Sequence, residues 1–116
     1  MVMHELSVTQ GLVDTVLKSA KDNHADSVKS VSIVMGEYYD YVPEIIEEYF
    51  EVIAEDTVAA DAKLYFKSVP VKIHCNRCNK DYSGKGISAI RCTTCGTKEI
   101  QVLEGRELFI ESMEIE

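Results

Sequence analysis

Two pairs of cysteines restrict the possible folds of this chain more than any other feature of its sequence. The first pair is Cys75 and Cys78, the second is Cys92 and Cys95, and thirteen residues separate the pairs. Two residues between the members of a pair let one tight turn direct both sulfurs at one point. Two such turns supply the tetrahedral thiolate cage that Zn²⁺ accepts, and the spacing is close to the zinc-ribbon pattern. The sequence therefore predicts a structural zinc site with four cysteine ligands.

The residues around the cysteines support this prediction. Asp81 and Tyr82 can pair with residues 87–90 as a short hairpin around a turn that contains two glycines. Gly96, directly after the second pair, suits the positive φ that closes such a turn. Three alternatives stay open: two disulfides, an iron site of the rubredoxin type, and a redox dithiol. The lack of a secretory signal disfavours disulfides, and a redox dithiol is more often a single pair beside a βαβ unit.

Length and composition set the scale of the fold. A chain of 116 residues suits one small domain that carries a smaller, metal-stabilised module. The segment from Cys75 to Cys95 is too short to bury a core, so we expect the metal to stabilise it. The rest of a chain that is 46% hydrophobic can form the larger core. No apolar run approaches a membrane span and no basic, apolar leader is present, so we expect a cytoplasmic protein.

The distribution of charge disfavours nucleic acid as a partner. Of the net charge of −8, residues 75–95 contribute +3 because four basic side chains outnumber one acidic side chain, and the remaining residues carry −11. Four thiolates and one Zn²⁺ would reduce the charge of the loaded ribbon to about +1. Ribbons that bind nucleic acid need a basic surface to neutralise phosphates. A nearly neutral ribbon attached to an acidic body lacks one.

Hydrophobic periodicity predicts two helices and three strands outside the cysteine segment. The first helix ends near residues 22–24, and Pro43 opens a second helix that ends at residues 56–57. Period-two alternation predicts strands over the three ranges 28–35, 63–69 and 107–115. The apolar residues of the last strand are expected to avoid solvent; they are Phe109, Met113 and Ile115.

These elements predict an α+β fold. We expect a small three-stranded sheet covered on one face by two helices, with the zinc ribbon inserted between the second and third strands. The expected boundaries assign residues 1–70 and 105–116 to an α/β domain and residues 71–104 to the zinc-ribbon domain.

A histidine lies close to the amino terminus. The terminal amine, intervening deprotonated amides and the imidazole of His4 can surround a metal in a plane, a geometry that Cu(II) and Ni(II) prefer. The positive end of the first helix disfavours the imidazolium form and keeps the ring available as a ligand. Glu5 could orient the ring or add an oxygen ligand. Removal of Met1 would leave His4 as the third residue, which itself supports planar binding by four nitrogens. A lone histidine near a terminus is otherwise usually only solvated.

Five short motifs follow one another along nearly the whole chain. They are Met3-His4-Glu5-Leu6-Ser7-Val8, Gly36-Glu37, Val42-Pro43-Glu44, the two cysteine pairs with Gly96, and Gly105-Arg106-Glu107-Leu108. In order and spacing they resemble the HypA/HybF family, the nickel metallochaperones of hydrogenase maturation. Tyr38 and Tyr39 are bulkier than the small residues expected after Gly-Glu in this family.

The resemblance implies a role in metal transfer. It implies that the protein receives Ni²⁺ and passes it, with a GTPase of the HypB type, to the large-subunit precursor of a [NiFe] hydrogenase. It maps the nickel site onto His4 and Glu5, with Met3 at the first position of the family, and it gives the four cysteines a structural Zn²⁺. It implies no membrane partner and is compatible with a homodimer.

Several residues keep a second interpretation. Asp40 could approach the nickel, although a solvated loop acid is favoured. His74 could enter the zinc shell, although an ordinary strand-end histidine is favoured, and we expect His24 to cap the first helix.

The function keeps a second interpretation as well. The chain could instead be a zinc-ribbon interaction module on a small α/β domain, which binds protein or nucleic acid without a nickel role. An enzyme is disfavoured, because the sequence has no glycine-rich phosphate loop or nucleophile elbow, and a complete four-cysteine zinc site leaves no position for water.

Overall fold

Two helices and six strands make up the part of the chain that the structure describes. This computed structural model describes residues 2–39, 41–84, 91–92 and 94–116, and for residues 2–4 and 84 only the element to which they belong. The helices are α1 (Val2–Asp22) and α2 (Pro43–Ile53). The strands are β1 (Val28–Gly36), β2 (Lys63–Val69), β3 (Val71–Cys75), β4 (Lys80–Gly84), β5 (Ile100–Glu104) and β6 (Leu108–Ile115). Neither helix is long and apolar enough, over its described residues, to cross a membrane.

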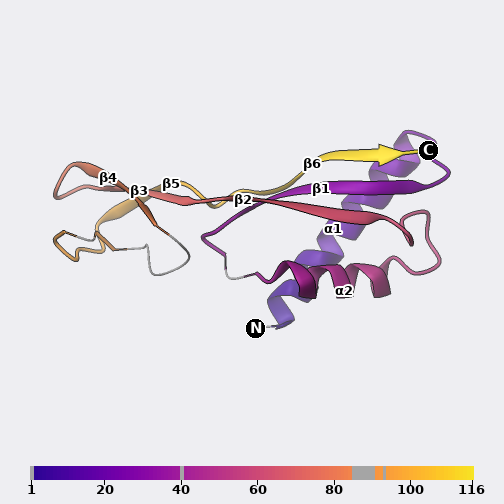
Figure 1. Cartoon of the computed structure of the whole chain (residues 1–116), viewed down its shortest axis with the longest axis horizontal. Coiled ribbons are helices and arrows are strands. Elements are labelled where there is room, and N and C mark those ends of the chain that lie inside the picture. Colours follow the sequence, from indigo (N-terminus) through magenta and orange to yellow (C-terminus); the bar gives the residue numbers. More distant parts are fainter. Residues whose placement is uncertain (1, 40, 85–90, 93) are drawn as a thin grey trace. The chain divides into compact units, whose positions relative to one another are not determined.

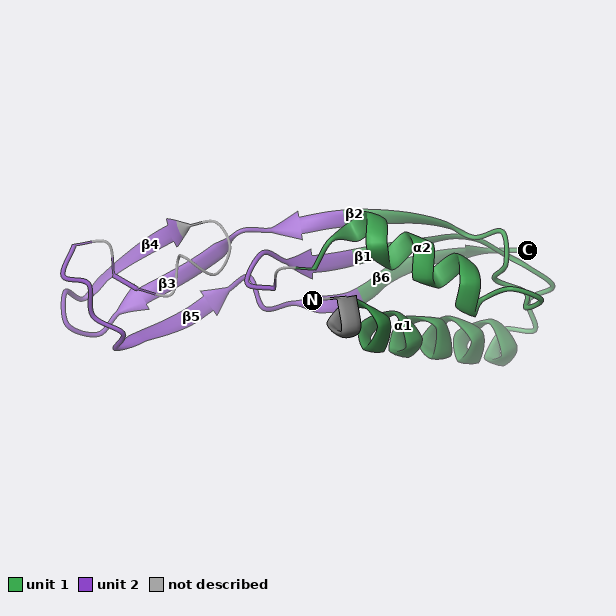
Figure 2. Cartoon of the chain, turned by 90° about the horizontal axis from the view of Figure 1, so that it is seen from below, with its two compact units in different colours: residues 1–33, 41–66, 110–116 green, residues 34–40, 67–109 purple. Residues whose placement is uncertain are grey.

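The strands form two three-stranded sheets. The first has the order β2-β1-β6, and the second has the order β4-β3-β5. In the first sheet β1 and β2 run in the same direction, and β6 runs in the opposite direction (Figure 2). Because α2 connects the two parallel strands, β1, α2 and β2 form a βαβ unit. The predicted α+β class, with the ribbon between the second and third strands of the first sheet, is confirmed.

Contacts within the chain divide it into two compact units. Unit 1 comprises residues 1–33, 41–66 and 110–116, and unit 2 comprises residues 34–40 and 67–109 (Figure 2). All four cysteines belong to unit 2, and residues 34–40, which precede α2, group with them. The expected boundaries of the α/β domain and the zinc-ribbon domain, at residues 70 and 105, stay a prediction.

Unit 1 has its core between the two helices and the sheet. Both helices lie on the same face of the first sheet (Figure 1). Apolar side chains from both helices and from β1 are buried there: Leu12, Val13, Val16, Ala20, Val28, Val31, Ile33, Ile46, Phe50 and Ala54. Burial of one large aliphatic or aromatic side chain stabilises a fold by about 1.5–3 kcal/mol, so this shared core holds the helices on the sheet.

The helix ends follow from local backbone geometry. The N–H of His24 donates to the Lys21 carbonyl at 3.1 Å, that of Ala25 to the Ala20 carbonyl at 2.9 Å, and His24 has a φ of 53°. This is the Schellman arrangement, so His24 caps α1 as expected. Helix α2 begins at Pro43, as predicted, but ends at Ile53, before the predicted residues 56–57. The φ of 64° at Asp56 is incompatible with a continuing helix.

Unit 2 is organised around β3, which pairs antiparallel with both β4 and β5. Val71 and Ile73 are its buried centre, and four half-buried apolar side chains pack on them: Tyr38, Tyr82, Ile100 and Val102. Asp81 and Tyr82 pair with His74 and Ile73 of β3. Their predicted hairpin partner, residues 87–90, lies outside the described residues.

Two glycines allow a close backbone crossing next to this sheet. A Cβ on Gly36 would lie 1.8 Å from the carbonyl oxygen of Gly105, and one on Gly105 would lie 2.6 Å from the Cα of Val71. Gly105 also has a φ of 103°, which residues with a side chain rarely adopt. The crossing brings the N–H of Tyr38 within 3.0 Å of the Gly105 carbonyl and that of Gly36 within 2.7 Å of the Glu107 carbonyl.

The expectation that the last strand hides its apolar side chains was wrong for two of three residues. Phe109 is 49% exposed and Ile115 is 37% exposed, whereas Met113 is half-buried. In the order β2-β1-β6 the last strand is an edge strand, so it has a neighbour on one side only. Its side chains are therefore covered by a neighbouring strand on one side only.

Candidate metal centre

The first cysteine pair is shaped by the end of β3. Cys75 is the last residue of that strand, and a turn follows in which the N–H of Cys78 donates to the Cys75 sulfur at 3.2 Å. The N–H of Asn79 donates to the Cys75 carbonyl at 2.8 Å, and Asn79 has a φ of 54°, which asparagine tolerates better than most residues. The strand thus fixes Cys75, and the turn brings Cys78 to the same side.

The second cysteine pair lies in a turn that precedes β5. The N–H of Gly96 donates to the Cys92 carbonyl at 2.9 Å, and that of Cys92 donates to the Thr97 carbonyl at 3.1 Å. Gly96 has a φ of 69°, as predicted for the residue that closes this turn. These bonds fold the backbone back on itself, so Cys92 and Cys95 face one point.

The four sulfurs converge with the spacing of a tetrahedral site. They all lie within 4.8 Å of one another, and the Cys75–Cys95 and Cys78–Cys92 sulfur distances are both 3.8 Å. With Zn–S bonds of about 2.3 Å, a tetrahedron places its sulfurs about 3.8 Å apart. All four cysteines are free, whereas a disulfide needs an S–S distance of about 2.05 Å. The geometry therefore fits a thiolate-bound ion and not two disulfides.

The four cysteines differ in their exposure. Cys75 and Cys92 are buried, Cys78 is half-buried, and Cys95 is exposed. A chelator or a thiol reagent can therefore reach Cys95 first, while the fold covers the other ligands.

The thiols also differ in how readily they ionise without metal. Hydrogen bonds from the backbone of Cys95 and then of Thr94, with smaller contributions from Tyr82 and Cys75, lower the pKa of Cys92 to about 6 against the opposing effect of burial. A hydrogen bond with Cys95, followed by burial and contacts with the other thiols, raises the pKa of Cys78 to about 12. Without metal, the fold therefore favours the thiolate of Cys92 and the protonated thiol of Cys78.

His74 has a partner other than the sulfurs. Its Nδ1 lies 2.6 Å from Oδ1 of Asp81 across the β3–β4 pair. Neighbouring residues of a strand point to opposite faces, so His74 and Cys75 face away from each other. This favours the strand-end interpretation of His74 over entry into the metal shell.

The predicted nickel residues lie at the start of α1. Met3 and His4 belong to the helix, but their side chains are outside the described residues, as is Asp40. Glu5 is only 2% exposed, and its carboxylate accepts a hydrogen bond of 3.4 Å from the N–H of Val42. Among the described residues, the four cysteines are the group of metal ligands that the fold brings together.

Tyr38 and Tyr39 are part of unit 2. The ring of Tyr38 packs on the Val71–Ile73 cluster and carries the Arg106 guanidinium at 5.1 Å from its centroid. The hydroxyl of Tyr39 donates to the Arg106 carbonyl at 3.0 Å. The large side chains at these two positions therefore make contacts within unit 2, with the Val71–Ile73 cluster and with Arg106.

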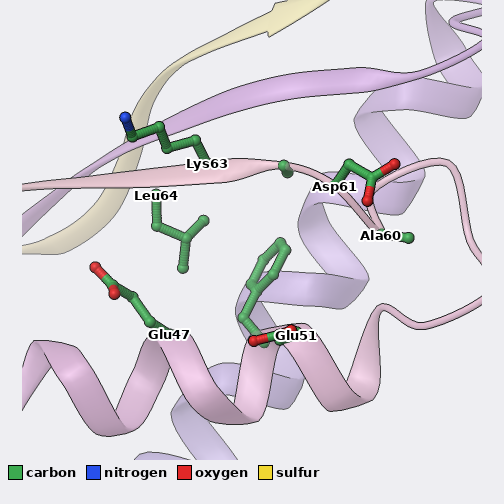
Figure 3. A pocket seen from close by; sticks show the side chains of 8 residues that line it. Glu47, Glu51, Ala60, Asp61, Lys63 and Leu64 are labelled. Atoms are coloured by element: carbon green, nitrogen blue, oxygen red, sulfur yellow. The ribbon is translucent and has the colours of Figure 1, made fainter.

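A hollow of about 390 Å³ lies in unit 1 between α2 and the start of β2 (Figure 3). Glu47, Glu51 and Asp61 line it together with Lys63, and the apolar Phe50 and Leu64 contribute to its wall. None of the described residues that line it is a histidine, a cysteine or a hydroxyl nucleophile.

One contact at the metal centre was not predicted. The hydroxyls of Tyr82 and Thr94 lie 2.6 Å apart, which joins β4 to the second cysteine turn. Only the register of β4 against β3 could have indicated it, because that register sets the face on which Tyr82 lies.

Comparisons with known proteins extend over the whole of this arrangement. The family model described as "Hydrogenase/urease nickel incorporation, metallochaperone, hypA" matches residues 3–115. The hydrogenase maturation factor HypA of Caldanaerobacter subterraneus subsp. tengcongensis is 36% identical over 115 residues, which cover 98% of this chain and 100% of that protein. The factor of the same name from Dehalococcoides mccartyi strain CBDB1 is 34% identical over 114 residues, covering 98% and 95%. The solution structure of the Ni metallochaperone HypA from Helicobacter pylori has a TM-score of 0.68 at 25% identity and covers 96% of both chains.

Proposed function

Because this chain belongs to the HypA family of nickel-incorporation metallochaperones, we propose that it delivers Ni²⁺ to the large-subunit precursor of a [NiFe] hydrogenase. The observation that carries the proposal is the extent of the family match, which runs from Met3 to residue 115 and so includes the amino-terminal motif and all four cysteines. In this proposal the protein binds and transfers a metal and catalyses no reaction.

The nickel site in this proposal consists of Met3, His4 and Glu5. The His4 imidazole and neighbouring backbone nitrogens supply a nitrogen-rich set of the kind that Ni(II) prefers. The burial of Glu5 and its bond to Val42 support a role in which its side chain holds the start of α1 in place. A nitrogen-rich site with exchangeable ligands would also allow transfer of the ion to an acceptor, which a closed cage would prevent.

The four cysteines hold structural Zn²⁺ in this proposal. The support is the 3.8 Å spacing of two opposite sulfur pairs, which suits a tetrahedral thiolate site. Bound Zn²⁺ would cross-link the two cysteine turns. The chain itself supplies the strand that fixes Cys75 and the N–H groups that favour the Cys92 thiolate.

The partners in this proposal are a GTPase of the HypB type and the hydrogenase precursor, in the cytoplasm. Neither nucleic acid nor a membrane takes part, and a homodimer is compatible with the scheme. The alternative function, a zinc-ribbon interaction module without nickel, shares the cysteine site and differs only at the amino terminus.

A His4→Ala variant distinguishes the two functions. We expect it to lose nickel in equilibrium dialysis and to keep one zinc per chain in elemental analysis. His24→Asn is the matched control, because His24 is an exposed histidine outside the proposed nickel site and asparagine tolerates its positive φ. Unchanged nickel binding by His4→Ala would leave the interaction module as the better interpretation.

Delivery needs its own experiment. The nickel-loaded protein is mixed with purified large-subunit precursor, with and without the GTPase and GTP, and the nickel content of the re-isolated precursor is measured. We expect transfer from the wild type and none from His4→Ala. Equal nickel uptake by the precursor from free Ni²⁺ and from the loaded protein would contradict a delivery role.

A further inference from the structure

The second cysteine turn is connected to β4 by a contact between two hydroxyl groups. Tyr82 comes from the middle of β4, and its hydroxyl oxygen lies 2.6 Å from Oγ1 of Thr94, between Cys92 and Cys95. Such a distance is typical of a short hydrogen bond between two hydroxyls. Tyr82 is half-buried and Thr94 is exposed, so the bond lies at the rim of the metal centre.

The position of Tyr82 is fixed by the strand that carries the first cysteine pair. Tyr82 is opposite Ile73 in the β3–β4 register, and its ring packs on the cluster of Val71 and Ile73. Cys75, the last residue of β3, is opposite Lys80 in the same register. The Tyr82 side chain is thus held by the same sheet that positions Cys75.

The second turn holds its own shape but depends on other groups for its position. The bonds from Gly96 to Cys92 and from Cys92 to Thr97 are internal to residues 92–97. They set the conformation of the turn and leave its placement against Cys75 and Cys78 to other contacts. The bond between Tyr82 and Thr94 is a contact of this kind.

We propose that Tyr82 and Thr94 form a clamp that positions the second cysteine pair for zinc and slows the release of the metal. This inference rests on the zinc role proposed above, and Tyr82 is a positioning residue and not a ligand. Thr94 directly precedes Cys95, the exposed ligand. A clamp at Thr94 therefore restrains the sulfur that a competing chelator reaches first.

The test measures the rate at which zinc leaves the full-length, zinc-loaded protein for a chromogenic chelator in excess. Tyr82→Phe keeps the ring on its apolar cluster and removes only the hydroxyl, and Thr94→Val removes the hydroxyl with almost no change of shape. A neutral hydrogen bond of ordinary strength corresponds to a rate increase of about two- to tenfold for each variant. Both variants break the bond between Tyr82 and Thr94, and Tyr82→Phe also removes the hydrogen bond from Tyr82 to Cys92. We therefore expect the double variant to release zinc no faster than Tyr82→Phe alone.

Two further variants separate the clamp from general effects. Thr94→Ser keeps a hydroxyl and is expected to release zinc at nearly the wild-type rate. Tyr65→Phe removes the hydroxyl of an exposed tyrosine on β2 and is expected to change nothing.

The possible outcomes distinguish the proposed clamp from the zinc role on which it rests. A wild-type protein without bound zinc would overturn the zinc role itself. Zinc-loaded Tyr82→Phe and Thr94→Val with wild-type release rates, or multiplied effects in the double variant, would overturn the clamp and leave the zinc role intact. If Tyr82→Phe fails to fold, the clamp is still tested by the zinc release rates of Thr94→Val and Thr94→Ser, because position 94 is exposed in the turn.

Discussion

The carboxylate of Glu5 in α1 accepts a hydrogen bond from the backbone N–H of Val42, which precedes the first turn of α2. Val42 makes no capping hydrogen bond with its own side chain, so the bond from Glu5 ties the start of one helix to the start of the other. Glu5 also lies within residues 3–115, which the family model matches. A residue expected at the nickel site thus has a measurable structural role.

Substitution of Glu5 should separate this structural role from metal ligation. Glu5→Ala removes the acceptor and leaves the Val42 N–H without it, so we expect a loss of about 1–3 kcal/mol in urea unfolding. Glu5→Gln keeps an acceptor oxygen, so its loss of stability should be smaller. Glu48→Ala, at an exposed position of α2, is the control and should change stability by less than about 0.5 kcal/mol. If Glu5→Gln stays stable but loses nickel, the carboxylate is a ligand and not only a support.

Nickel binding should unwind the first turn of α1. The helix begins at Val2 and includes His4, whereas a planar site requires successive amide nitrogens to turn toward one ion. The first N–H groups of a helix have no intrahelical partner, so the change costs few hydrogen bonds. In NMR spectra of the zinc-loaded protein, we expect nickel to remove the N–H signals of the amides that bind it, to shift the other signals of residues 2–6, and to leave those of Val13 and Val16 in place. Amide signals in the first turn that shift but all persist at nickel saturation would mean that side chains alone bind the ion.

Local patterns were sufficient for most of the fold. The start of α2 follows from Pro43, whose fixed φ and missing N–H suit the first turn, and the positive φ of Gly96 follows from the need to close a tight turn. The cysteine spacing predicted four sulfurs around one point, which the 3.8 Å distances confirm. The first two features depend on residues close together in the sequence, and the third depends on a cysteine spacing that is typical of one ligand geometry.

The features that were missed depend on distant residues. The exposure of Phe109 follows from the edge position of β6, which no periodicity within the strand reveals. The burial of Glu5 depends on Val42, and the bond of Tyr82 depends on Thr94. Strand order and helix packing create such pairs, so a single sequence indicates the residues without indicating their partners.

Two glycine-to-alanine substitutions should have opposite effects on stability. In Gly36→Ala the new Cβ would meet the Gly105 carbonyl oxygen at 1.8 Å, so the crossing must open and its hydrogen bonds must lengthen. We expect a loss of about 1–3 kcal/mol or more in urea unfolding. In Gly11→Ala, on the exposed side of α1, the Cβ meets nothing within 4 Å, and we expect a gain of about 0.5–1 kcal/mol. An unchanged free energy of unfolding for Gly36→Ala would show that the crossing adapts without loss of stability.

The pH dependence of zinc binding should change slope near the pKa of Cys92. Its pKa of about 6 in the metal-free fold lies below the ordinary value of 9.0, mainly because the Cys95 N–H favours the thiolate. In the metal-free protein the stabilisation from ionised Cys92 is complete above pH 9.0 and is lost as the pH falls through about 6. Zinc requires the thiolate, so Cys92 releases no proton on binding well above that pH and one proton below it.

A chelator competition measured from one pH unit below that pKa to one unit above it tests this assignment. The logarithm of the zinc affinity should rise with pH, and its slope should be steeper by about one proton below pH 6 than above it, because Cys92 joins the ligands that must deprotonate. Cys92→Ser lacks the thiol and should bind zinc more weakly without this change of slope. A wild-type slope that stays constant through pH 6 would mean that Cys92 is still protonated in the metal-free fold. In that case the N–H groups of Cys95 and Thr94 do not favour its thiolate before the metal binds.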